Sequence, residues 1–174
     1  MKHLTQQLVR NLFLPGVAAL LLSTPLPSHA VQLGRPAPEF SLADLQGNTV
    51  SISSLRGKVV ILNFWSTACV PCVKEIPALN NLYLDLQGDG LSVLGIALDS
   101  SDKPVRELAS RLKIRYPVLL DKAKDVYFDA YGLFGQPVSV IIDRRGIVRD
   151  KIYGEVDWAS QTVKKKLNNY LKGG

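Results

Sequence analysis

Histidine is nearly absent from this sequence of 174 residues, since its only two, His3 and His29, lie within the first thirty positions. Cysteine is equally scarce, and Cys69 and Cys72 are the only pair. Without the first thirty residues, no histidine remains to act as the general base for a cysteine nucleophile. Two cysteines also cannot close a four-ligand zinc site within one chain. The composition therefore excludes cysteine-histidine catalysis and the usual zinc centres from residues 31–174.

Beyond the first thirty residues, the sequence has no apolar run long enough to cross a bilayer. Within them, Lys2 and Arg10 precede an apolar segment, 12–22, and the small residues Ser28 and Ala30 fit a cleavage site after Ala30. As a helix, this segment of about eleven residues spans only roughly 16 Å, about half of a hydrocarbon core. We expect residues 1–30 to be a cleaved signal peptide that directs export to the periplasm. An uncleaved N-terminal membrane anchor is the alternative.

Residues 31–174 have a length that suits one domain, and no repeat or low-complexity segment divides them. Loss of the leader lowers the formal net charge from +6 to +4. The basic residues lie mostly in two runs, 143–151 and 162–172, which we interpret as solvated surface. This mild and diffuse positive charge does not indicate a nucleic-acid partner.

Apolar periodicity predicts strands that alternate with helices. The run 58–65 is apolar without interruption, as in a strand covered on both faces. Together the elements predict an α/β protein with a mixed sheet and helices on both faces. The other expected elements are an N-terminal hairpin (40–44 and 48–52), a helix from the cysteines to near Gly88, strands at 91–99, 116–121, 138–143 and 147–154, helices at 103–113 and 125–132, and a last helix capped by Asp157.

The segment "NFWSTACVPCVKEIP", 63–77, contains both cysteines and allows three interpretations. As a structural staple, a disulfide that closes a loop of about four residues stabilises the fold by only about 2 kcal/mol in the chain-entropy model. As a metal site, two thiolates suit linear copper(I) better than zinc. The third interpretation is a reactive dithiol.

The position of the cysteines favours the reactive pair. Cys69 falls where a buried strand leads into a helix, and the unpaired N–H groups and helix dipole there stabilise an anion. Such a site lowers a thiol pKa below about 8.5, so thiolate is available at neutral pH. Cys69 is then the attacking sulfur, and Cys72 is the resolving sulfur one turn further on. Pro71 between them restricts the backbone of the ring.

The stretch "VVILNFWSTACVPCVKEIP" resembles the active-site segment of thioredoxin-like proteins, specifically the extracytoplasmic thiol-disulfide oxidoreductases of the TlpA/ResA type. The resemblance extends to "APEFSLADLQGNTVSISSLRGK" and "YGLFGQPVSVIIDRRGIV", and so covers essentially all of residues 31–174. It implies a thioredoxin-like three-layer sandwich with an N-terminal β-hairpin extension.

The resemblance also implies roles for individual residues. Pro137 matches a proline that follows a cis peptide bond and faces the disulfide, and Glu75 matches a glutamate that handles protons near the cysteines. Trp65 matches an aromatic residue ahead of the motif. With Gln136 and Pro71, Pro137 and Trp65 are expected to form the client-binding surface.

Three positions depart from the family pattern: Ala68 replaces the usual tryptophan before the first cysteine, Gln136 stands where many relatives have a hydrophobic residue, and Val138 stands where threonine is common. Asn63, as in ResA-type relatives, stands where cytoplasmic thioredoxins have a buried acid. Glu75 is therefore the expected route for protons.

The function implied by the resemblance is reduction of protein disulfides through a mixed disulfide, by a monomer without cofactor or metal. Expected clients are apocytochromes c or copper-site assembly proteins, and the expected electron donor is a membrane-embedded protein. One alternative is a peroxiredoxin-type peroxidase, although Leu62 and Ser66 occupy the positions where that motif needs proline and threonine. The other is a non-enzymatic copper(I) delivery module.

Overall fold

The computed structural model describes residues 31–173, so the expected signal peptide lies outside the described residues. Strands and helices alternate along the chain, as the apolar pattern predicts. In order, the elements are β1 (Ser41–Ala43), β2 (Thr49–Ser51), η1 (Ser53–Leu55), β3 (Val59–Trp65), α1 (Val70–Leu86), η2 (Gln87–Asp89), β4 (Leu91–Ala97), α2 (Asp102–Arg111), β5 (Val118–Leu120), η3 (Asp125–Ala130), β6 (Val138–Ile142), β7 (Val148–Tyr153) and α3 (Gln161–Leu171).

Five strands form the central sheet in the order β5-β4-β3-β6-β7. β3, β4 and β5 run parallel, whereas β6 pairs antiparallel with the other side of β3, and β7 pairs antiparallel with β6. β1 and β2 pair separately as the expected N-terminal hairpin. The predicted mixed sheet is therefore confirmed, and β3 is its central strand.

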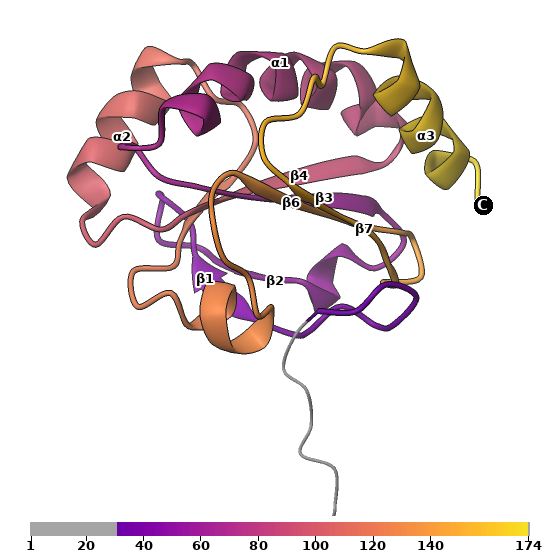
Figure 1. Cartoon of the computed structure of the whole chain (residues 1–174), viewed down its shortest axis with the longest axis horizontal. Coiled ribbons are helices and arrows are strands. Elements are labelled where there is room, and N and C mark those ends of the chain that lie inside the picture. The colour runs from indigo at the N-terminus through magenta and orange to yellow at the C-terminus, as the bar shows by residue number, and fades with distance from the viewer. Residues whose placement is uncertain (1–30, 174) are drawn as a thin grey trace, which may run out of the picture.

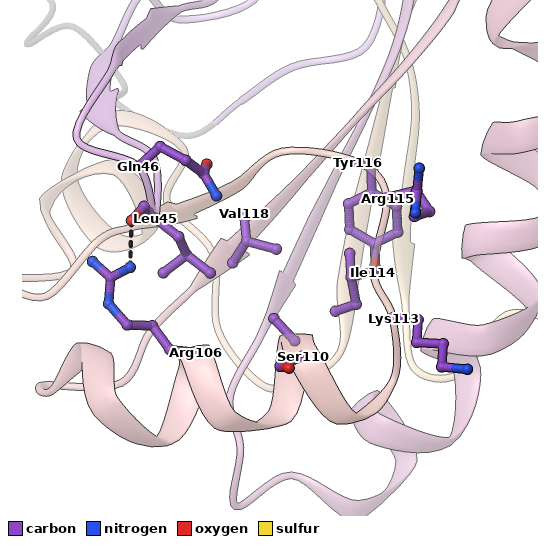
Figure 2. A pocket seen from close by; sticks show the side chains of 10 residues that line it. Leu45, Gln46, Arg106, Ser110, Lys113, Ile114, Arg115, Tyr116 and Val118 are labelled. Atoms are coloured by element: carbon purple, nitrogen blue, oxygen red, sulfur yellow. Dashed lines mark hydrogen bonds between the residues drawn. The ribbon is translucent and has the colours of Figure 1, made fainter.

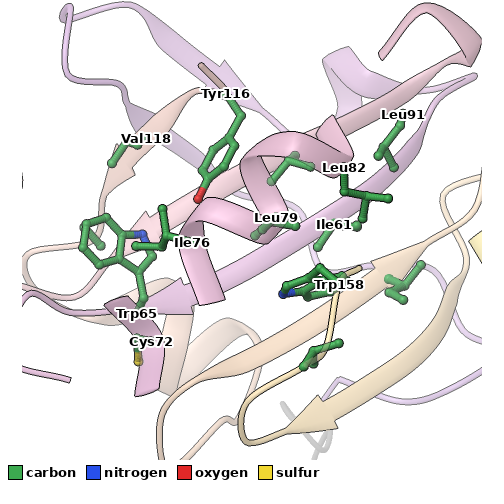
Figure 3. Close-up of a cluster of buried hydrophobic side chains, with 14 of the residues drawn as sticks. Ile61, Trp65, Cys72, Ile76, Leu79, Leu82, Leu91, Tyr116, Val118 and Trp158 are labelled. Carbon is green, nitrogen blue, oxygen red and sulfur yellow. The ribbon is translucent and has the colours of Figure 1, made fainter. Parts of the chain in front are cut away.

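Every side chain of β3 is buried, because the strand is covered on both faces. Val59, Ile61 and Trp65 point into a core that they share with α1, α2 and α3 (Figure 3). Their neighbours Val60 and Phe64 point into a second core on the opposite face. Because successive side chains of a strand point to opposite faces, β3 contributes to both apolar cores.

The two faces of the sheet are covered differently. The three α-helices lie together over one face (Figure 1). The other face is covered by the N-terminal segment, the hairpin and the π-helical turn η3, with aromatic contacts between Phe64 and both Tyr127 and Tyr131. The three-layer arrangement is as expected, but on this second face the helical elements are only the short turns η1 and η3.

The predicted start of the last helix is wrong. Asp157 accepts the N–H of Ala159 at 3.1 Å in a preceding turn, and α3 begins only at Gln161. Ser160 is the N-cap, and its hydroxyl accepts the N–H of Val163 at 3.4 Å. The turn directs Trp158, which is fully buried, into the core, and that burial delays the helix.

A hollow of about 430 Å³ lies between the hairpin turn, α2 and β5 (Figure 2). The guanidinium of Arg106 reaches across it and donates to the backbone oxygen of Leu45. None of residues 63–77 or 136–137 lines this hollow, so it is separate from the site of the cysteine pair. Among residues 31–173, no helix is long and apolar enough to cross a membrane.

Candidate active site

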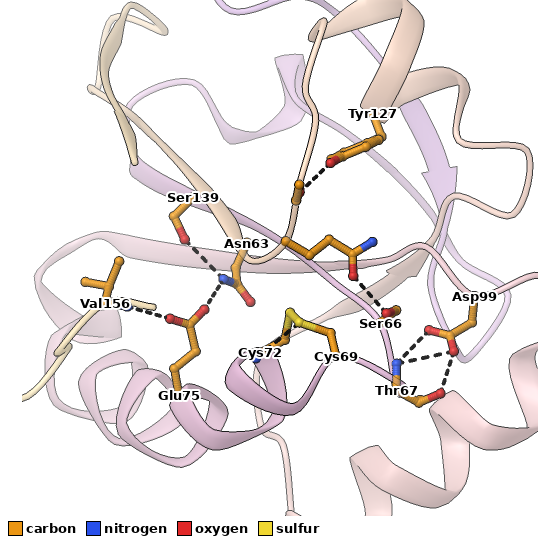
Figure 4. Close-up of a disulfide and its surroundings, with 12 residues drawn as sticks. Asn63, Ser66, Thr67, Cys69, Cys72, Glu75, Asp99, Tyr127, Ser139 and Val156 are labelled. Atoms are coloured by element: carbon orange, nitrogen blue, oxygen red, sulfur yellow. Dashed lines mark hydrogen bonds between the residues drawn. A yellow bond between two sulfur atoms is a disulfide. The ribbon is translucent and has the colours of Figure 1, made fainter. Parts of the chain in front are cut away.

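Cys69 and Cys72 form a disulfide at the start of α1, with their Cα atoms 5.3 Å apart (Figure 4). Cys69 is the N-cap residue, and its sulfur accepts the N–H of Cys72 at 3.3 Å. Cys69 is half-buried, whereas Cys72 is completely buried. A client sulfur therefore has access to Cys69 but not to Cys72.

The helix starts at this point because the chain turns sharply after β3. The N–H of Cys69 donates to the backbone oxygen of Ser66 at 3.2 Å, and the N–H of Val73 donates to the oxygen of Cys69 at 3.1 Å. Pro71 lies in the first turn, where its missing N–H would have no helical acceptor in any case. The N–H of Cys72 faces the sulfur of Cys69 at this helix start, which is an arrangement that stabilises a thiolate.

Glu75 lies one turn beyond Cys72 and is buried, with 3% of its surface exposed. One carboxylate oxygen accepts the side-chain N–H of Asn63 at 2.7 Å, and the other accepts the backbone N–H of Val156 at 2.8 Å. Burial raises the pKa of Glu75 above its ordinary value, although these two hydrogen bonds act in the opposite direction. The glutamate is thus a buried acid near the inner sulfur, and not a solvated helix residue.

Asn63 connects three elements beneath the disulfide. From β3, its amide nitrogen donates to Glu75 on α1 and also to the hydroxyl of Ser139 on β6, at 3.1 Å. An amide can donate to a carboxylate without adding a second negative charge, so Glu75 is the one ionisable group of this trio. Position 63 therefore carries no acid, and the proton-handling role expected of Glu75 stays a prediction.

Pro137 follows a cis peptide bond, as the resemblance implied, and is buried. Its backbone oxygen accepts the N–H of Gly154 at 2.8 Å. The side-chain oxygen of Gln136 accepts the hydroxyl of Ser66 at 2.8 Å, which ties this loop to the segment before Cys69. The hydroxyl of Tyr127 donates to the backbone oxygen of Gly135 and holds the loop from the other face of the sheet.

The other two expected client-binding residues, Pro71 and Trp65, differ in exposure. Pro71 is exposed next to the disulfide, as are its neighbours Ala68 and Val70, the latter 78% exposed. Trp65 is fully buried beneath them. Its ring packs in the helix-covered core, so in this structure it supports the site from below and offers no surface to a client.

Sequence reasoning missed the contacts that hold the loop before Cys69. Thr67 and Asp99 hydrogen-bond to each other there, and neither was among the expected site residues. A signal was present, because Asp99 follows the end of β4, and the carboxyl ends of parallel strands meet at one edge of a sheet. The partners Ser139 and Val156 had no comparable signal.

A half-exposed cysteine joined to a buried one at a helix start, beside a cis-proline loop and a buried glutamate on this sheet, defines a thioredoxin-fold thiol-disulfide oxidoreductase. The AhpC/TSA family model matches residues 33–151, and the chain belongs to this family. It is 37% identical over 142 residues to thiol-disulfide oxidoreductase ResA of Bacillus anthracis, covering 82% of this chain and 78% of that protein. It is also 37% identical over 123 residues to thioredoxin-like protein YneN of Bacillus subtilis, covering 69% and 71%.

Solved structures show the same fold. The crystal structure of a putative thiol:disulfide interchange protein DsbE from Chlorobium tepidum matches with a TM-score of 0.75 and 27% identity, covering 82% of this chain and 99% of that one. The solution structure of a putative thioredoxin from Neisseria meningitidis matches with a TM-score of 0.70 and 31% identity, covering 79% and 91%. The thioredoxin-like fold expected from the sequence is therefore confirmed.

Proposed function

We propose that this oxidoreductase is exported and acts as a reductant of protein disulfides, with Cys69 as the attacking sulfur and Cys72 as the resolving one. The difference in exposure between the two sulfurs carries this proposal, because a client disulfide has access only to Cys69. The buried carboxyl group of Glu75 near the inner sulfur supports it further.

The reaction starts from the dithiol form. The thiolate of Cys69 attacks one sulfur of the client disulfide, so that a mixed disulfide forms and the other client sulfur leaves as a thiolate. Cys72 then gives up its proton and attacks the sulfur of Cys69, which releases the second client thiolate and closes the Cys69–Cys72 disulfide. Two electrons pass to the client.

Glu75 is the proposed acceptor for the proton of Cys72. Its raised pKa places its proton exchange nearer to neutral pH, where a general base is most effective. Cys72 is completely buried, so solvent has no direct access to its thiol proton. A carboxylate one helical turn away supplies the missing route, and Asn63 and Val156 hold it in place.

The client-binding surface proposed for this reaction consists of Gln136, Pro137 and Pro71, with Trp65 as support. The side-chain oxygen of Gln136 is the acceptor for Ser66, so its side-chain nitrogen takes no part in that hydrogen bond. That amide nitrogen can donate to a backbone oxygen of an extended client segment. The clients are proteins outside the cytoplasm, with apocytochromes c and copper-site assembly proteins as candidates, and a membrane-embedded protein returns the electrons to a monomeric enzyme.

The test of this mechanism is a trapping experiment with purified single-cysteine variants and a peptide that contains one disulfide. Cys72→Ser should accumulate a mixed disulfide through Cys69, because the resolving step is missing. Cys69→Ser should accumulate little, because Cys72 is buried. Trapping by Cys69→Ser alone would reverse the two roles, and a reduction potential well above that of thioredoxin, about −270 mV, would argue against a reductant.

The AhpC/TSA family match makes a peroxidase the second candidate function. The site offers little support, because Leu62 is buried within β3 and the hydroxyl of Ser66 is engaged by Gln136. Reduced protein that consumes hydrogen peroxide over many turnovers, and does so without Cys72, would favour the peroxidase. Tight one-to-one binding of copper(I) by protein that shows no exchange activity would instead favour a copper carrier.

A further inference from the structure

The segment between β3 and Cys69 is only three residues long, and side chains from two other parts of the sheet hold it (Figure 4). On one side, Thr67 donates twice to Asp99. Its backbone N–H lies 3.1 Å from one carboxylate oxygen, and its hydroxyl lies 2.5 Å from the other. Hydrogen bonds to an ionised acceptor are stronger than neutral ones, so this contact is a firm clamp.

Asp99 is itself fixed in position. It follows β4, and the N–H of the preceding residue, Leu98, donates to the backbone oxygen of Trp65 at 2.9 Å. The carboxylate is therefore anchored to the same strand end that carries the loop. Both donors of Thr67 are engaged by this carboxylate, while the donor to the sulfur of Cys69 is the N–H of Cys72.

The opposite side of the segment is held by the cis-proline loop. Ser66 donates its hydroxyl to Gln136 at 2.8 Å, and the backbone oxygen of Ser66 accepts the N–H of Cys69. Ser66 and Thr67 are both half-buried, whereas the next residue, Ala68, is exposed. The two clamps thus leave Ala68 and Cys69 as the part of the segment that meets a client.

We propose that Thr67 and Asp99 are positioning residues for the exchange reaction, because they fix the peptide that presents Cys69 to the client disulfide. The inference rests on the proposed role of Cys69 as the attacking sulfur. Exchange requires that sulfur to align first with the client and then with Cys72, and a small displacement of a reacting atom lowers a rate steeply. The carboxylate of Asp99 has a second effect, because it is bound to Thr67, two residues before Cys69, and a negative charge beside the segment that carries the sulfur disfavours formation of a second anion there.

The experiment measures alkylation of Cys69 by iodoacetamide as a function of pH, in a Cys72→Ser background, together with reduction of the peptide disulfide by the intact dithiol. Thr67→Val removes the hydroxyl at nearly constant volume, and we expect it to slow peptide reduction about tenfold. Thr67→Ser keeps the hydroxyl and should stay within about twofold of the parent rate. Asp99→Asn should move the midpoint of the alkylation profile to lower pH.

The matched control is Asp102→Asn, which removes a carboxylate three residues further on that contacts Arg106 and Lys122 instead of the loop. It should change neither the rate nor the profile. The proposal is overturned if Thr67→Val reduces the peptide at the parent rate, or if Asp99→Asn leaves the alkylation profile unchanged. Failure of the proposed function looks different. The reactive thiol would then be that of Cys72, so the Cys69→Ser variant would react and the Cys72→Ser variant would not.

Discussion

At the scale of single residues, Glu75 shows how burial changes the chemistry of a side chain. The same glutamate on an open helix surface would be ionised at neutral pH and solvated. Here it has two hydrogen-bond donors, Asn63 and Val156, and almost no exposed surface. Because desolvation outweighs the two hydrogen bonds, its pKa is raised.

The raised pKa makes a prediction about stability. Between the ordinary pKa of about 4.5 and the raised value, the folded protein keeps a proton that the unfolded chain has released, so stability falls as pH rises through this window. Glu75→Gln cannot ionise and should lose this part of the pH dependence. Urea unfolding of both proteins from about pH 4 to about pH 8 should show the wild type losing stability relative to the variant.

The control for that measurement is Glu107→Gln, which replaces an exposed glutamate on α2 and should run parallel to the wild type. If Glu75→Gln also runs parallel to the wild type, the carboxyl group is not perturbed in the fold. Its proposed role in moving the proton of Cys72 would then lose its support.

At the scale of elements, α3 shows that a good capping residue does not by itself start a helix. Asp157 and Ser160 are both strong N-cap types, and the sequence pattern favoured the first. The structure uses the second, because Trp158 must enter the core before the helix can begin. Local propensity therefore offered two starts, and packing selected one.

The choice of cap can be tested by substitution. Ser160→Ala removes the acceptor for the N–H of Val163 and should lower the free energy of unfolding by about 1 kcal/mol, measured with urea. Asp157→Ala removes only a hydrogen bond in an exposed turn ahead of the helix and should have a smaller effect. The opposite ranking would mean that α3 starts earlier in solution than it does here.

At the scale of the whole molecule, the sheet brings together groups from distant parts of the chain. β3 delivers the cysteines, β4 delivers Asp99, and β6 begins directly after Pro137. The disulfide sits where these three strand ends meet. Because a disulfide constrains the unfolded chain, the redox state of the pair and the stability of the fold are linked.

This linkage predicts that the oxidised protein is more stable than the reduced one, as expected for a reductant whose disulfide form is favoured. The chain-entropy model for a loop of about four residues puts the difference at about 2 kcal/mol. Urea unfolding with and without a reducing agent measures it, and the double variant Cys69→Ser, Cys72→Ser should not respond to the reducing agent. A more stable reduced form would instead mark an oxidant, whose thiolate is the stabilised species.

The sequence by itself determined the α/β class, the reactive pair at the end of a buried strand and the exclusion of histidine chemistry from residues 31–174. These follow from local facts, namely apolar periodicity, residue types and a spacing of three positions. The resemblance to a known family added the cis peptide bond before Pro137, which the structure confirms.

Only the tertiary structure decided that Glu75 is buried, that Ser66 meets Gln136 and that Thr67 meets Asp99. The three hydrogen bonds that establish this join residues 81, 70 and 32 positions apart. Such contacts depend on how strands are ordered in the sheet and on which strand ends lie side by side. Periodicity along the chain carries no information about that order, because each element satisfies its own pattern in any arrangement that buries its apolar face.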